Sequence, residues 1–272
     1  MPSHPQINAA QLARLVGLAG GPAIIDVRND EDFAADPRLI PGSIRRDFAT
    51  VATWAPDFAG KQAVVSCQRG AKLSEGVAAW LRNEGIAAEN LEGGFEAWVA
   101  SSFPLVRTAK LPKRDPKGRT IWVTRARPKI DRIACPWLIR RFIDTDAVIL
   151  FVQASEVNGV AERFSATPFD IEDVFFSHRG ERCTFDTMLD EFGLDTEPLR
   201  RLATIVRAAD TARPDLAPEA AGLLAVSLGL SRNFRDDLEQ LDAAMSVYDA
   251  FYRWCRDATE ETHNWPNPKR GA

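Results

Sequence analysis

Short apolar runs alternate with amphipathic segments along the first part of the chain. Three of these runs predict buried strands, at residues 23–27, 63–66 and 86–91. Helices are predicted at residues 8–16, 73–83 and 92–98, and a turn at residues 40–44. The residues expected to face inward are Leu12, Leu15 and Val16 on the first helix and Val77, Trp80 and Leu81 on the second. Strands that alternate with helices imply an α/β fold, a parallel sheet with helices on both faces.

The second part of the chain has a different pattern. Strands are predicted at residues 121–124, 147–152 and 174–177, and short helices at residues 136–142 and 156–164. Beyond residue 184 the pattern is helical. In the longest helix one apolar stripe repeats at three and four positions, through Leu238, Leu241, Met245, Tyr248, Tyr252 and Cys255, and predicts a core face. The second part is therefore expected to be an α+β domain with a largely helical C-terminal portion.

Composition supports two domains. The chain has 272 residues, of which 45% are hydrophobic and 26% charged, which is enough for two separate cores. Residues 107–119 hold six basic residues and one acidic residue, with two prolines and a glycine. We therefore expect a first domain at residues 1–106, a basic linker at residues 107–119 and a second domain at residues 120–272. Both flanking parts are mildly acidic and show no helix-turn-helix pattern, so a nucleic-acid partner is not favoured.

The compartment follows from the N-terminus and the cysteines. The chain starts without a basic segment followed by an apolar one, and no apolar run is long enough to span a bilayer. The four cysteines, at positions 67, 135, 183 and 255, form no CxxC pair. We expect a reduced, cytoplasmic protein without a membrane partner.

Cys67 stands between a predicted strand and a predicted helix, with Gly70 in the turn that joins them. Ligands of parallel sheets bind beyond the carboxyl ends of the strands, and this is where Cys67 is expected. Backbone N–H groups, a helix N-terminus and the cations Arg69 and Lys72 can stabilise a thiolate there. The alternative is that Cys67 is a small buried apolar residue, as most free cysteines are.

Four motifs together resemble a single rhodanese domain across residues 5–105. They are Asp26-Val-Arg28, Ile40-Pro-Gly42, Cys67-Gln-Arg-Gly-Ala-Lys72 and Glu92-Gly-Gly-Phe-Glu-Ala-Trp98. The resemblance implies a sulfurtransferase that carries sulfane sulfur as a persulfide on Cys67 and needs no cofactor. It implies a persulfide-binding loop at Gln68, Arg69, Gly70, Ala71 and Lys72, and a structural pair of Asp26 and Arg28. The partners would be a small sulfur donor and a thiol acceptor.

The loop length separates reaction classes. A phosphate-sized anion needs a wider loop and an arginine six positions after the nucleophile, where this chain has Leu73. Phosphatase or arsenate-reductase chemistry is therefore not favoured. The chain also departs from the family, which often has arginine at the sixth loop position, because it has Lys72. A lysine is a point charge without a bidentate fork, which weakens the case for thiosulfate as the preferred donor.

Polar residues concentrate at four places in the second part of the chain, each at a predicted element end. The candidate site residues are Asp131, Arg132, Cys135, Arg179 and Asp210. The candidate ligands for a transition metal (zinc, iron or manganese) are His178, Cys183, Asp186, Glu261 and His263, although their spacing matches no local metal motif. The arginines at positions 132, 140, 141, 179, 207 and 213 either line an oxyanion pocket or pair with Asp131, Asp144 and Asp210.

Several stretches of the second part resemble the chromate-resistance domain family. They include residues 127–142, 177–180, 183–186, 216–218 and 262–266. The resemblance implies a context of chromate or metal stress, with chromate or a metal as a partner, and identifies no catalytic residue. The function expected for the whole chain is sulfur transfer in that context. The alternative is a non-enzymatic sensor that responds to chromate or a metal.

Overall fold

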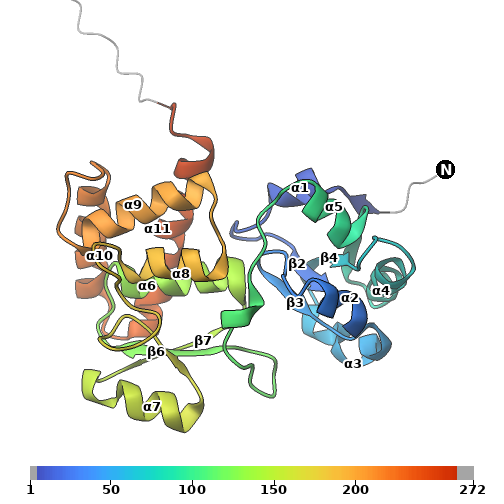
Figure 1. Ribbon diagram of the computed structural model, residues 1–272, viewed down its shortest axis with the longest axis horizontal. Helices are drawn as coiled ribbons and strands as arrows, with labels where there is room; N and C mark the ends of the chain where they lie inside the picture. The colour runs from blue at the N-terminus through green and yellow to red at the C-terminus, as the bar shows by residue number, and fades with distance from the viewer. Residues whose placement is uncertain (1–4, 262–272) are drawn as a thin grey trace, which may run out of the picture.

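The first half of the chain forms a five-stranded parallel sheet in the computed structural model, which describes residues 5–261 (Figure 1). Its strands are β1 (Gln6–Ile7), β2 (Ala23–Asp26), β3 (Ser43–Arg45), β4 (Gln62–Ser66) and β5 (Ala87–Leu91). Their order is β1-β5-β4-β2-β3, and every neighbouring pair is parallel. The three predicted strands are confirmed, and the two that the pattern did not predict, β1 and β3, are very short.

Helices cover both faces of this sheet, as predicted. They are α1 (Ala9–Ala13), α2 (Asp30–Ala35), α3 (Val51–Trp54), α4 (Lys72–Asn83) and α5 (Gly94–Ala100). Successive strand residues point to opposite faces, so Ile24 packs in the same apolar cluster as Phe95 of α5, and Ile25 in the same cluster as Val77 of α4. Asn8 caps the first helix, since its side chain accepts a hydrogen bond from the backbone N–H of Gln11.

Two of the predicted inward-facing residues are exposed. Trp80 of α4 is 45% exposed, and Leu15 is 38% exposed because α1 ends before it, at Ala13. Their partners on the same predicted faces, Leu12 and Leu81, are buried. The pattern therefore predicted the centre of each buried helix face correctly but assigned too many residues to the face.

The second half contains a smaller parallel sheet and a group of helices. The strands, in the order β7-β6-β8, are β6 (Ile121–Arg125), β7 (Val148–Val152) and β8 (Thr167–Pro168). The helices are α6 (Asp131–Leu138), α7 (Val157–Phe164), α8 (Thr184–Phe192), α9 (Glu197–Asp210), α10 (Ala220–Asn233) and α11 (Asp237–Asp257). A π-helical turn, Ile139–Ile143, continues α6. The predicted α+β class with a largely helical C-terminal portion is confirmed.

Two details of the second half differ from the prediction. Residues 174–177 form no strand and contribute a single bridge, between Phe176 and Phe169. The apolar alternation was real, since Phe176 is buried and Phe175 exposed, but there is no neighbouring strand for a longer ladder. On α11 the predicted stripe is buried except at its first residue, Leu238, which lies in the first turn of the helix and is 47% exposed.

The two halves share a core, contrary to the expectation of two separate ones. The largest cluster of buried apolar side chains contains residues of both halves, among them Leu12, Ile40 and Phe142. Phe142 is central to this contact: its carbonyl accepts a hydrogen bond of 2.6 Å from the N–H of Gly42, and its ring lies against Gly17. The second half therefore contacts the first at residues that precede β2 and β3, at the amino ends of the strands.

The predicted linker is attached to both halves. Its first residue, Arg107, donates its backbone N–H to the carbonyl of Phe192, and the Thr108 hydroxyl donates to the carbonyl of Pro37 at 2.6 Å. Further along, Arg114 forms an ion pair of 3.2 Å with the buried carboxylate of Asp144. The segment is therefore held in place on each side. Within residues 5–261, no helix combines the length and apolar character needed to cross a membrane.

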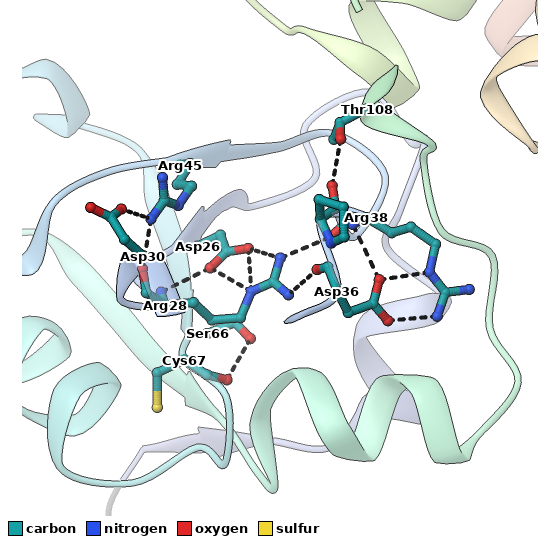
Figure 2. Close-up of polar contacts among 10 residues, drawn as sticks. Asp26, Arg28, Asp30, Asp36, Arg38, Arg45, Ser66, Cys67 and Thr108 are labelled. Atoms are coloured by element: carbon teal, nitrogen blue, oxygen red, sulfur yellow. Dashed lines mark hydrogen bonds and ion pairs between the residues drawn. The ribbon is translucent and has the colours of Figure 1, made fainter. Parts of the chain in front are cut away.

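A buried ion pair between Asp26 and Arg28 supports the carboxyl end of β2 (Figure 2). The Arg28 guanidinium donates to both oxygens of Asp26, at 2.6 to 3.1 Å, and its remaining N–H groups donate to the carbonyls of Asp36 and Arg38 at 2.8 and 2.7 Å. Its Cζ also lies 3.7 Å from the centre of the Phe95 ring. Arg28 therefore connects a strand end, a following loop and α5.

The Gly17–Phe142 contact makes a prediction about stability. Gly17 and Gly20 both have left-handed φ values, of 76° and 74°, so an alanine at either position costs about 1 to 2 kcal/mol of backbone strain. Only at Gly17 would the new Cβ also collide, at 2.2 Å, with Cζ of Phe142. Gly17→Ala should therefore lower the melting temperature more than Gly20→Ala, and adding Phe142→Leu should recover part of the difference. Equal losses in calorimetry would contradict the contact.

The Asp26–Arg28 pair makes a second prediction. Arg28→Met leaves a buried carboxylate without its counter-ion, which should lower the free energy of unfolding by about 3 to 5 kcal/mol. The matched control is Arg38→Met, which removes an ion pair of the same length, 2.6 Å, from an arginine side chain that is 45% exposed. That loss should stay below about 1 kcal/mol. Urea unfolding of both variants measures the difference, and similar losses would show that burial does not govern it.

Candidate functional site

Cys67 lies at the carboxyl edge of the first sheet, directly after β4 and before α4, as the sequence predicted. The residue is 5% exposed and belongs to the apolar cluster under α4, as expected if it were a small buried apolar residue. Two polar atoms contact the sulfur: the Ser74 hydroxyl at 3.0 Å and the carbonyl of Ala71 at 3.9 Å. The Ser74 hydroxyl also donates to the carbonyl of Ala71, at 3.2 Å, and either the hydroxyl or the thiol can be the donor in their mutual contact.

The carbonyl groups of the loop after Cys67 are turned toward neighbouring elements. The N–H groups of Phe95 and Glu96, at the start of α5, donate to the carbonyls of Cys67 and Gln68, at 2.9 and 3.0 Å. The side-chain amide of Asn90 donates to the carbonyl of Gly70 at 2.8 Å. In a planar trans peptide the next N–H points the opposite way, so the N–H groups that follow are directed away from these partners.

The N–H groups of this loop make no hydrogen bond with the rest of the described chain. Within the described part of the chain, none of the backbone N–H groups of residues 68–72 donates a hydrogen bond to a protein acceptor. Successive free N–H groups at the start of a helix are a site that attracts anions. Of the predicted loop residues, Arg69 and Lys72 are exposed, and Arg69 lies 3.4 Å from Glu96.

Glycines allow the loop and α5 to approach each other. Gly70 and Gly94 have left-handed φ values of 64° and 59°. A Cβ on Gly70 would lie 2.3 Å from the carbonyl oxygen of Leu91, and a Cβ on Gly94 would lie 2.3 Å from the carbonyl oxygen of Cys67. The loop and the Gly-Gly turn before α5 therefore form one unit, which explains why both motifs occur in the same sequence.

A second group of functional side chains converges in the other half of the molecule. The Nε2 atom of His178 lies 3.2 Å from Asp210, 3.4 Å from Asp170 and 3.5 Å from Asp131. We call these four residues the carboxylate cluster. They come from four places: the start of α6, the segment after β8, the loop before α8 and the end of α9. The helices α6, α8 and α9 pack together around it (Figure 1).

Asp131 is the most buried member, with no exposed surface. Its oxygens accept the backbone N–H groups of Thr184 and Phe185, at 2.6 and 3.0 Å, from the first turn of α8. Burial raises the pKa of Asp131 to about 6, and the charges of Asp170 and Asp210 act in the same direction, while the hydrogen bond to His178 opposes them. Hydrogen bonds to Asp131, Asp170 and Asp210 raise the pKa of His178 to about 12.

The backbone before Asp131 is strained. Ile130 has a φ of 39°, in the left-handed region that β-branched residues avoid. Its N–H donates to the Ser227 hydroxyl at 3.2 Å, and its carbonyl accepts from the Tyr248 hydroxyl at 2.8 Å. Such conformations cost about 1 to 3 kcal/mol and persist where the surroundings impose them, often at functional sites.

The two cysteines beside the cluster are hydrogen-bond donors. The Cys135 thiol donates to Asp131 at 3.7 Å, and the Cys183 thiol donates to Asp186 at 3.4 Å. Burial raises the pKa of both thiols, and the charge of Asp131 raises it further. Both cysteines are therefore protonated at neutral pH. Asp186 in turn is paired with Arg207 at 2.9 Å.

The predicted metal ligands are only partly brought together. His178 lies in the carboxylate cluster with Asp131 and Asp210, which were predicted as site residues, whereas Cys183 and Asp186 bond to each other. Glu261 is exposed beyond the end of α11, and His263 lies outside the described residues. Asp170 was not predicted. It follows a two-residue strand, and the only signal near it in the sequence is the acidic stretch that continues with Glu172 and Asp173.

The arginines are mostly paired, but not with the expected partners. The pairs are Arg132 with Asp170, Arg140 with Asp242, Arg141 with Asp249, Arg179 with Glu191, Arg207 with Asp186 and Arg213 with Asp215. Asp144 pairs instead with Arg114. Two of the predicted set, Arg207 and Arg213, line a common cavity of about 510 Å³ together with Arg182. Arg179 points to Glu191 and the Phe175 ring, away from the cluster.

Comparison with known protein families matches both halves of the chain. The family described as "Rhodanese-like domain" matches residues 8–101, and the family described as "ChrB, C-terminal domain" matches residues 122–255. Protein ChrB of Cupriavidus metallidurans is 37% identical over 146 residues, which are 52% of this chain and 43% of that protein. The chain thus covers less than half the length of this curated relative.

Among solved structures, a rhodanese-like domain protein from Staphylococcus aureus is 28% identical, with a TM-score of 0.32, and the match covers 35% of this chain and 90% of that one. A thiosulfate sulfurtransferase from Pseudomonas aeruginosa is 24% identical, with a TM-score of 0.34, and the match covers 38% of this chain and 19% of that one.

Proposed function

We propose that this chain, which joins a rhodanese-like domain at residues 8–101 to a ChrB C-terminal domain at residues 122–255, transfers sulfane sulfur through a persulfide on Cys67. The first domain places the chain in a sulfurtransferase family, and the second connects it with chromate or metal stress. The reaction needs a small sulfur donor and a thiol or cyanide acceptor. It needs no cofactor.

The transfer takes two displacement steps. The Cys67 thiolate attacks the outer sulfur of a donor such as thiosulfate, a new S–S bond forms, and sulfite leaves with the electron pair of the broken bond. An acceptor nucleophile then attacks the outer sulfur of the persulfide. The persulfide bond breaks, the Cys67 thiolate is regenerated, and the acceptor carries the sulfur away.

The free N–H groups of residues 68–72 carry this proposal. They adjoin a thiol at a helix N-terminus, and the loop carbonyls are held away on the other side by α5 and Asn90. In the proposed mechanism these N–H groups stabilise negative charge on the sulfur in both steps, and the Ser74 hydroxyl, 3.0 Å from the sulfur, turns from the Ala71 carbonyl to donate to it. Because Cys67 is 5% exposed, small donors are favoured over bulky ones.

A non-enzymatic sensor is the second candidate, and one observation favours it. The carboxylate cluster lies in the other half of the molecule, and the shared core around Phe142 connects the two halves. In a sensor, occupation of the second half would be transmitted through this contact to a partner. A sulfur-transfer assay with thiosulfate or glutathione persulfide as donor and cyanide as acceptor separates the two functions, because a sensor turns over neither donor.

The assignment of the nucleophile is tested by serine variants of all four cysteines. Cys67→Ser should abolish sulfur transfer, because a serine hydroxyl forms no persulfide. Cys135→Ser, Cys183→Ser and Cys255→Ser should largely preserve it. Intact-protein mass spectrometry after incubation with the donor should find one added sulfur atom, which peptide mapping places on Cys67. Sulfur on another cysteine, or full activity of Cys67→Ser, would reject the proposal.

The role of Ser74 gives a further prediction. Ser74→Ala removes the hydroxyl next to the sulfur, and a hydrogen bond to a charged group contributes about 1.5 to 3 kcal/mol, so persulfide formation should slow by about tenfold or more. The control is Ser66→Ala, since the Ser66 hydroxyl contacts the carbonyl of Cys67 at 3.4 Å and not its sulfur. Stopped-flow measurement of the first step distinguishes the two variants. Equal rates would remove Ser74 from the mechanism.

A further inference from the structure

We propose that the carboxylate cluster of Asp131, Asp170, His178 and Asp210 binds one divalent transition-metal ion. Ligand atoms of Asp131, Asp170 and His178 all lie within 4.8 Å of one another, and Asp210 adds an oxygen 3.2 Å from the same nitrogen of His178. The members come from separate elements of the second half, so the fold brings them together. This site is independent of the sulfur transfer at Cys67.

The spacing of the cluster fits ligands that share one ion. Two ligand atoms that each lie about 2.0 to 2.2 Å from a metal are about 3.0 Å apart at an octahedral angle and about 3.5 Å apart at a tetrahedral angle. The distances from His178 Nε2 to the three carboxylate oxygens are 3.2, 3.4 and 3.5 Å. The three distances from the imidazole nitrogen therefore match those between ligands of one ion.

A protonated imidazole alone does not satisfy this arrangement. The Nε2 atom carries one N–H, which can make one strong hydrogen bond, whereas three carboxylate oxygens surround it. Charge-assisted hydrogen bonds of this kind are normally about 2.7 to 2.9 Å long, shorter than all three distances here. A metal ion interacts with every oxygen at the same time, and so accounts for a convergence that a single proton does not.

The net negative charge of the cluster also favours a divalent cation. Arg132 lies 3.2 Å from Asp170 and offsets one of the three carboxylates. Two negative charges remain, and a divalent ion bound to a neutral imidazole neutralises both. A protonated His178 neutralises only one of them.

The donor set indicates the class of metal. It consists of three carboxylates and one imidazole, and the neighbouring Cys135 and Cys183 use their thiol protons as donors to Asp131 and Asp186. Oxygen and imidazole ligands without thiolate suit manganese, iron or zinc in the divalent state, and do not suit soft ions such as copper(I).

Hydrogen bonds from neighbouring groups hold the ligands in place. Asp131 is fixed by two backbone N–H groups of α8, and the oxygen of Asp170 that faces His178 also accepts the Thr184 hydroxyl at 2.9 Å. The open side of the site is at His178 and Asp210, whose side chains are 39% and 20% exposed. Asp131 and Asp170 form its buried floor, and an ion can enter from solvent and retain water ligands.

The test uses the full chain after removal of metal with a chelator. Titration with Mn²⁺, followed by the electron paramagnetic resonance signal of the free ion, should find one bound ion per chain, and Zn²⁺ should displace it. Affinity should fall by more than about 100-fold in His178→Ala and Asp170→Asn, because losing a direct ligand should exceed the loss of about 10- to 100-fold caused by removing a group that only orients a ligand. Asp210→Asn, the mildest of these changes, should weaken binding at least about tenfold.

The control variant is Asp190→Asn. It removes a carboxylate of α8 that is 53% exposed and paired with Arg182, so it should leave the affinity for Mn²⁺ unchanged. Metal should also raise the melting temperature of the wild type and not that of His178→Ala. The proposal is overturned if the wild type shows no saturable binding of Mn²⁺ or Zn²⁺, or if His178→Ala and Asp210→Asn bind with wild-type affinity.

Discussion

A carboxylate that is removed from water has to be compensated, and both halves of this chain are built around such a carboxylate. Asp26 is compensated completely, because the guanidinium of Arg28 contacts both of its oxygens and uses its other donors on two carbonyls. Asp131 accepts hydrogen bonds from two backbone N–H groups and from the Cys135 thiol. It also contacts the His178 imidazole, which Asp170 and Asp210 contact as well. Since Asp170 and Asp210 lie beside that imidazole, the second half retains negative charge that its own side chains do not balance.

The Phe142 contact between the halves and the thiol of Cys67 lie at opposite edges of the first sheet. Phe142 lies against Gly17 and Gly42, which precede β2 and β3, whereas Cys67 follows β4. Because all strands of the first sheet are parallel, the contact is at their amino ends and the thiol is at the opposite edge.

The sequence predicted local structure better than it predicted which distant side chains come together in the fold. The strand, thiol, turn and helix around Cys67 are contiguous, so one short stretch contains the whole loop. The carboxylate cluster combines residues 131, 170, 178 and 210, and only packing of α6, α8 and α9 brings them together. Asp170 was missed because β8 has only two residues, one of them Pro168, and so the sequence pattern predicts no strand end before it. His178 was predicted as a ligand with Cys183 and Asp186, but those two lie at the cap of α8 and bond to each other.

The surroundings of the cysteines differ between the two halves. Cys67 lies next to loop N–H groups that have no backbone acceptor among the described residues, while Cys135 and Cys183 are buried beside carboxylates that disfavour a thiolate. Thiolate formation is therefore opposed in the second half, although that half contains more cysteines. Any reaction or sensing at the carboxylate cluster then depends on oxygen and imidazole ligands. The strain at Ile130 fits this division, since it holds Asp131 where two helix N-termini and His178 meet.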